Sequence, residues 1–135
     1  MTEFDFLKSV VLMDGHSIQK IALETAISLV AAEHSQPFGF GVEVYKVLDK
    51  IFMMTMTYQN EKIITLKCSP QDAEMLRDIY PSIRPGYHMN KKHWITIYPG
   101  KEITTELVTN LVIASYELVI RKLPKQQKKA LEAQK

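Results

Sequence analysis

The first third of the chain carries apolar residues at helical spacing. Within residues 1–12 they predict a short helix, which Asp14 and Gly15 bring to an end. Ser17 is expected to cap a longer helix over residues 18–33, because its hydroxyl can accept a hydrogen bond from a backbone N–H of the first turn. The positions of this helix that are predicted to face the core are Ile21, Thr25 and Leu29.

The middle of the chain changes to short, half-apolar runs that are typical of strands. Three such runs occupy residues 42–48, 51–58 and 62–68. The connections between them, at Asp49-Lys50 and at residues 59–61, are too short for a parallel crossover, which needs about a dozen residues or more. The three strands are therefore predicted to form an antiparallel meander.

Helical spacing returns twice after the meander, with a strand pattern in between. Ser69 is expected to cap the first of these helices, and residues 93–98 alternate in the manner of a strand. Thr104 or Thr105 caps a closing helix that extends to about residue 123. Its predicted inward-facing positions are Leu107, Leu111, Ala114 and Leu118.

This order of elements predicts an α+β fold, with an antiparallel sheet and helices packed on one of its faces. The 135 residues, 46% of them hydrophobic, suffice for a single domain with its own core and are too few for two. Residues 125–135 are polar and are expected to form a frayed basic tail.

The charge of the chain is unevenly distributed. The formal net charge is +2, but residues 1–80 carry −4, whereas residues 81–100 and 101–135 each carry +3. This gradient favours an anionic partner at the basic end. The single cysteine, Cys68, is interpreted as a buried apolar residue. Because the sequence also shows no leader-like or membrane-spanning apolar run, we expect a cytoplasmic protein with no membrane partner.

Residues 83–99 concentrate the features of a candidate binding site. They include the only Trp, two of the four His and three basic side chains, and they include no acid. Pro85-Gly86 predicts a turn in which the glycine takes a positive φ. Basic side chains can neutralise phosphates, and an aromatic ring can stack on a base. The competing interpretation is structural, with Trp94 packed in the core and the basic residues in a solvated turn.

The residue pattern disfavours catalysis and metal binding. His88 and His93 have no carboxylate between them, so they do not make a metal site. A proton-carrying role for either histidine would need an oriented partner, which the sequence does not show. Gly39-Phe40-Gly41 lacks the lysine and the following helix of a phosphate-binding loop. We therefore expect no enzyme activity, no cofactor and no metal.

The run RPGYHMNKKHWITIY, residues 84–98, resembles the signature of the MmcQ/YjbR-like family of small bacterial proteins. Other family motifs are matched in the same order, at Pro37-Phe38-Gly39, Lys46-Val47, Lys50-Ile51-Phe52, Leu66-Lys67-Cys68-Ser69-Pro70, Ser115-Tyr116 and Leu123-Pro124-Lys125. The likeness covers about residues 20–125, which leaves residues 1–15 as an N-terminal extension.

The resemblance implies a fold similar to the frataxin/CyaY group and low-specificity DNA binding through a double-wing arrangement. Asp49 stands where family members commonly have glycine, and it places an acid beside a candidate phosphate contact. The candidate DNA-binding residues are Lys46, Lys50, Lys67, Arg84, His88, Asn90, Lys91, Lys92, His93 and Trp94.

Two functions remain open at this point. The leading hypothesis is a monomer that binds DNA mainly through its phosphates, with Lys91 and Lys92 as the principal contacts and Trp94 as a packed anchor behind them. The alternative is an adaptor that binds a small molecule or a protein through an apolar surface made by Trp94, Tyr87 and His88. Lysines gathered on one surface would favour DNA binding, and lysines on separate faces would favour the adaptor.

Overall fold

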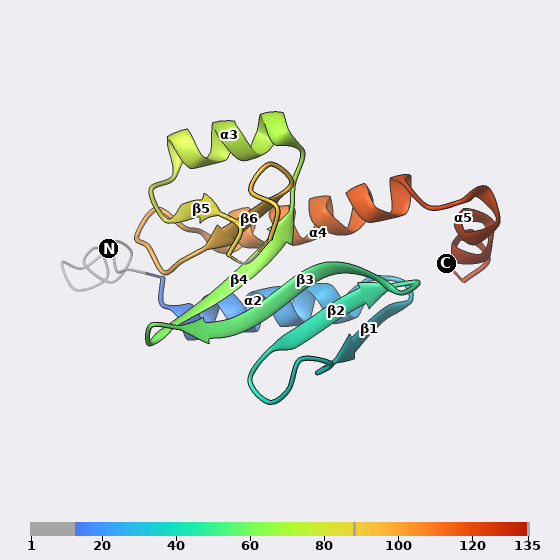
Figure 1. Ribbon diagram of the computed structural model, residues 1–135, viewed down its shortest axis with the longest axis horizontal. Coiled ribbons are helices and arrows are strands. Elements are labelled where there is room, and N and C mark those ends of the chain that lie inside the picture. Colours follow the sequence, from blue (N-terminus) through green and yellow to red (C-terminus); the bar gives the residue numbers. More distant parts are fainter. Residues whose placement is uncertain (1–12, 88, 135) are drawn as a thin grey trace, which may run out of the picture.

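The computed structural model describes residues 13–87 and 89–134, so the helix predicted within residues 1–12 lies outside the described residues. The described residues form an α+β fold built on a six-stranded sheet (Figure 1). The helices are α2 (Gly15–Ser28), α3 (Pro70–Ile79), α4 (Thr105–Arg121) and α5 (Lys125–Glu132). The strands are β1 (Ala32–Ser35), β2 (Glu43–Val47), β3 (Lys50–Tyr58), β4 (Glu61–Lys67), β5 (Ile83–Pro85) and β6 (Trp94–Ile97).

The sheet is antiparallel throughout, in the order β1-β2-β3-β4-β6-β5, and it confirms the predicted meander at β2, β3 and β4. Two-residue turns join these strands, at Leu48-Asp49 and at Gln59-Asn60. All four turn residues have positive φ, between 47° and 67°, as expected of type I′ turns that match the twist of a hairpin. Lys50 is thus the first residue of β3 and does not belong to the turn.

Helix α2 begins three residues earlier than its predicted start. Its cap is Asp14, whose carboxylate accepts the Ser17 N–H at 2.7 Å, so the prediction that Ser17 is the cap is wrong. Gly15 lies so close to β4 that a Cβ there would be 2.5 Å from the carbonyl oxygen of Lys62. The buried positions of α2 are Gly15, Ile18, Ala22 and Ala26, which shifts its core-facing stripe by one residue from the prediction.

The last part of the predicted second helix is a strand. Helix α2 ends at Ser28, and Ala31 has a φ of 60°, which turns the chain back on itself. Residues 32–35 then form the edge strand β1, which pairs with β2. Main-chain hydrogen bonds to β2 therefore replace the helical ones that the local sequence would allow.

Helix α4 packs with α2 against β3 and β4, and the residues it buries differ from the predicted ones. They are Val108, Val112, Ser115, Tyr116 and Val119. Three of the four predicted positions line a groove between α4 and α3 instead; these are Leu111, Ala114 and Leu118. The predicted frayed tail also differs, because α5 occupies Lys125–Glu132 and buries Leu131.

The opposite face of the sheet is partly covered by the connection between β5 and β6. Thr65 and Thr96 are buried there and share a hydrogen bond of 2.9 Å between their hydroxyls. The Tyr87 N–H donates to Thr96 Oγ1 at 2.9 Å, and the rings of Tyr87 and Tyr58 are 4.1 Å apart. Among the described helices, none has both the length and the apolar character needed to cross a membrane.

Candidate nucleic-acid interface

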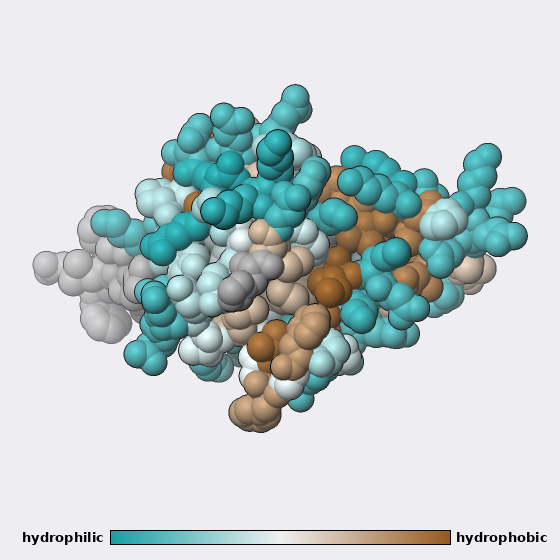
Figure 2. Space-filling model, viewed as in Figure 1, coloured by the Kyte–Doolittle hydropathy of each residue, from teal (hydrophilic) through white to brown (hydrophobic). Residues whose placement is uncertain are grey.

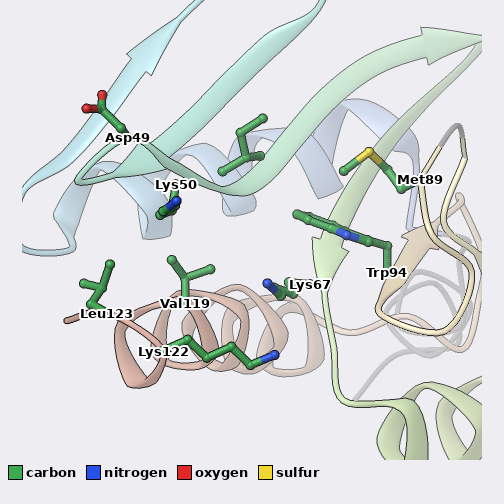
Figure 3. Close-up of a pocket in the computed structure, with 9 residues that line it drawn as sticks. Asp49, Lys50, Lys67, Met89, Trp94, Val119, Lys122 and Leu123 are labelled. Atoms are coloured by element: carbon green, nitrogen blue, oxygen red, sulfur yellow. The ribbon is translucent and has the colours of Figure 1, made fainter.

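A pocket of 430 Å³ lies between the sheet and the C-terminal end of α4 (Figure 3). We call it the basic pocket, because three of its lining residues are lysines. Its lining consists of Asp49, Lys50, Ile51, Lys67, Met89, Trp94, Val119, Lys122 and Leu123.

The strand register explains why residues distant in sequence meet here. Because β3 and β4 are antiparallel neighbours, the first residue of β3, Lys50, and the last residue of β4, Lys67, lie at the same end of the sheet. Lys67 pairs directly with Trp94, the first residue of β6. The end of α4 brings Lys122 to the same place.

Figure 3 shows Lys50, Lys67 and Lys122 around the same pocket, while the carboxylate of Asp49 points away from them. Burial lowers the pKa of Lys67, and the positive charges of Lys122 and then Lys50 lower it further. Within the described part of the chain, no carboxylate lies within 4.0 Å of these three ammonium groups; the ion pair found there joins His34 and Glu43. The basic pocket therefore holds cations that repel one another and that an anion would stabilise.

Trp94 supports Lys67. The Lys67 Nζ lies 5.9 Å from the centre of the indole ring, within the range of a cation–π contact. Met89 and Lys67 lie on opposite sides of the indole in Figure 3. Trp94 is half-buried and acts as a wall of the pocket, which agrees with the predicted anchor and leaves little of its face for stacking on a base.

Ser115 fixes the backbone of Lys67. Its buried hydroxyl accepts the Lys67 N–H at 2.8 Å and donates to the carbonyl oxygen of Phe52 at 2.6 Å. One side chain of α4 is thereby bonded to both β4 and β3 beside the pocket. This contact gives a physical role to the serine of the Ser115-Tyr116 motif.

Gly86 is required for a reason other than the predicted one. It has no positive φ, so the turn predicted at Pro85-Gly86 is wrong, and Pro85 belongs to β5. The Gly86 N–H donates to the Trp94 carbonyl at 2.9 Å, and a Cβ on Gly86 would be 2.5 Å from the Trp94 Cβ. Glycine lets β5 approach the strand that carries the indole.

The structure brings three predicted site residues together, Lys50, Lys67 and Trp94, and leaves others outside the pocket. Arg84 instead places its guanidinium 4.2 Å from the centre of the Tyr98 ring. The Asn90 side chain accepts the Lys92 N–H at 2.9 Å and so stabilises its own loop. The predicted residues that do not line the pocket are Lys46, Arg84, Asn90, Lys91, Lys92 and His93, and His88 lies outside the described residues.

Sequence reasoning missed Lys122 and Met89 as parts of the pocket. Lys122 directly precedes the Leu123-Pro124-Lys125 motif, and nothing in its local spacing connects it with β3 or β4. Tyr87 does not line the basic pocket, and its ring contacts Tyr58 instead.

A metal site and a reactive cysteine both find little support in the described part of the chain. No group of three or more His, Cys, Asp or Glu side chains there is arranged to hold a metal ion. Cys68 is buried, and burial raises its pKa to about 11, so its thiol stays protonated at neutral pH. This agrees with its interpretation as an apolar core residue.

The surface around the C-terminal half of α4 is partly apolar and partly hydrophilic. In Figure 2, an apolar area lies over this part of the molecule, and hydrophilic side chains border it. The basic pocket has the same division, since its apolar side is formed by Ile51, Val119 and Leu123.

Comparisons with known proteins find the same family by a family model and by individual relatives. The model of the YjbR family matches residues 27–118. The uncharacterised protein YbdF of Escherichia coli O157:H7 is 43% identical over 117 residues, which is 87% of this chain and 96% of YbdF. The uncharacterised protein YjbR of Escherichia coli K12 is 33% identical over 109 residues, covering 81% of this chain and 92% of YjbR.

Solved structures show the same fold. The crystal structure of Deinococcus radiodurans protein DR2400, a DUF419 domain, has a TM-score of 0.72 at 31% identity and covers 89% of this chain and 88% of its own. A Pseudomonas syringae protein has a TM-score of 0.55 at 25% identity and covers 64% of this chain and 86% of its own.

Proposed function

We propose that this chain, which belongs to the YjbR family, binds DNA mainly through contacts between lysines and phosphates. Base sequence would contribute little. The observation that carries the proposal is the convergence of Lys50, Lys67 and Lys122 on one pocket without a carboxylate partner among the described residues. The pKa of Lys67 is lowered mainly by burial and then by the charges of Lys122 and Lys50, and an anion in this pocket would offset that repulsion.

The number of lysines sets the expected salt dependence. Each phosphate neutralised on duplex DNA contributes about −0.9 to the slope of log K against log salt concentration. If the three pocket lysines each neutralise one phosphate, the slope is about −3, which is its largest expected magnitude, and replacing one of them then reduces that magnitude by about one. Binding through the basic residues of α5 alone would not respond to changes in the pocket.

The test is fluorescence anisotropy with a labelled duplex of about 20 base pairs, titrated at several salt concentrations starting at about 50 mM. The pocket variant is the triple Lys50→Gln, Lys67→Gln, Lys122→Gln. The matched control removes the same charge from exposed positions outside the pocket, as Lys20→Gln, Lys101→Gln, Lys129→Gln.

We expect the pocket variant to lose most of its affinity and most of its salt slope. The control keeps a slope near that of the unmodified protein, because its lysines make no pocket contact. Equal losses in the two variants would reject the pocket as the site. Absence of binding to duplex and single-stranded DNA by the unmodified protein at about 50 mM salt would reject DNA binding itself.

A further inference from the structure

The shape of the basic pocket restricts which phosphate it can hold. DNA backbone is a continuous track of charge, and a surface that follows it needs cations along its length. Here the three lysines lie around one concavity of 430 Å³, and the remaining wall includes Ile51, Val119 and Leu123. An apolar wall cannot neutralise the next phosphate along a strand, but it can cover a sugar or a base.

The charge of the pocket restricts the ligand further. Its lining has three lysines and one carboxylate, a net formal charge of +2. A phosphodiester carries a single negative charge, whereas a phosphomonoester carries about −1.5 to −2 at pH 7. Because Asp49 points away from the lysines, a dianion placed among the ammonium groups would not meet a carboxylate in contact. Net charge and geometry both favour the monoester.

The central cation is held in place before any ligand arrives. The Lys67 backbone is bonded to Ser115, and its ammonium lies 5.9 Å from the Trp94 ring centre. Groups that are already ordered lose less entropy when they bind, so affinity is gained without further contacts. Lys50 and Lys122 are exposed and can close on the ligand from two sides.

We propose that the basic pocket binds the terminal phosphomonoester of a DNA strand, with the phosphate among Lys50, Lys67 and Lys122 and the terminal nucleoside on the apolar wall. The inference rests on the proposed DNA binding and narrows it to strand ends. The same chemistry is present in a free nucleotide, which the experiment treats separately.

The experiment compares four oligonucleotides of one sequence at one salt concentration. They carry a 5′-phosphate, a 3′-phosphate, no terminal phosphate, or a 5′-phosphate blocked as its methyl ester. Each carries the dye at an internal position. We expect at least one phosphorylated end to bind about tenfold more tightly than the unphosphorylated strand, a preference that the methyl ester removes. The preference should shrink below about pH 6, where the monoester takes up its second proton.

Single-lysine variants distinguish an effect of the pocket from an effect of the overall charge of the protein. Lys67→Gln and, independently, Lys50→Gln should abolish the preference, while Lys101→Gln should keep it. Equal affinity for all four oligonucleotides would overturn the inference and leave DNA binding in place. If none of the oligonucleotides binds but deoxyadenosine monophosphate does, as measured directly by isothermal titration calorimetry, the result would support monoester recognition but assign it to free nucleotides and reject the proposed DNA function. If neither DNA nor the nucleotide binds, both proposals fail.

Discussion

Ser115→Ala tests whether one hydroxyl holds α4 against the strands that carry the basic pocket. Ser115 is fully buried, and its hydroxyl donates to the Phe52 carbonyl at 2.6 Å and accepts the Lys67 N–H at 2.8 Å. Alanine would leave both main-chain groups without this partner, and each buried polar group left unpaired costs about 1–3 kcal/mol. Because Lys67 is only half-buried and water can reach part of it, we expect a total loss of about 2–4 kcal/mol.

Urea denaturation measures this loss directly. With a denaturant dependence of about 2 kcal/mol per molar urea, the midpoint should fall by about 1–2 M. The control is Ser28→Ala at the exposed end of α2, where the hydroxyl bonds only to Thr25 in the same turn. A change at such a surface position is expected to stay within about 0.5 kcal/mol.

The same variant connects stability with binding. If Ser115 positions Lys67, Ser115→Ala should weaken phosphate binding more than Val112→Ala, which truncates another buried residue of α4 without touching the pocket. A stability loss below about 0.5 kcal/mol, equal to that of Ser28→Ala, would refute the argument from unpaired main-chain groups. Equal binding by the two α4 variants would refute the positioning role.

Three further predictions concern the turns and an acid-sensitive contact. Asp49→Gly relieves a non-glycine φ of 67° and removes the pocket's carboxylate; thermal denaturation should show a gain of up to about 1 kcal/mol, and anisotropy should show tighter phosphate binding. Gly100→Ala should lower the unfolding free energy by about 1–3 kcal/mol in urea, because the new Cβ would be 1.8 Å from Ser82 Oγ, and an unchanged midpoint would contradict this. The hydrogen bond from His34 lowers the pKa of Glu43 below its usual 4.5, so the stability that its charged form contributes is present above that pH and lost as the pH falls through the folded-state pKa. The unfolding free energy of Glu43→Gln should therefore fall less steeply than that of the unmodified protein as the pH is lowered below about 4.5. An identical pH dependence in the two proteins would show that Glu43 makes no such contribution to stability.

The parts of the fold that could be predicted are those decided by neighbouring residues. Ser69 does cap α3, where its hydroxyl accepts the Asp72 N–H at 3.2 Å, because capping needs only a residue of the right type before a helix. The hairpins around β3 follow in the same way from short polar connections. Both features are set within about four residues of chain.

Long-range contacts decided the parts that could not be predicted. Residues 32–35 continue a helical pattern, yet they form β1 because β2 supplies main-chain partners. Helix α4 is apolar around much of its circumference, so periodicity alone could not show which stripe meets the sheet. The branched valines 108, 112 and 119 took that position, and Leu111 and Leu118 were left facing the groove beside α3.

The candidate site shows why clustering in sequence is a poor guide to convergence in space. Lys91 and Lys92 are adjacent and were the favoured contacts, but both are exposed in the loop and neither lines the pocket. Lys50, Lys67 and Lys122 are far apart in sequence and belong to three different segments. Like charges that are neighbours in a loop lower their repulsion by pointing into water, whereas the strand register and the end of α4 hold the backbones of Lys50, Lys67 and Lys122 at one place. Burial lowers the pKa of Lys67 first, and the charges of Lys122 and then Lys50 lower it further; the proposed anion binding rests on this arrangement.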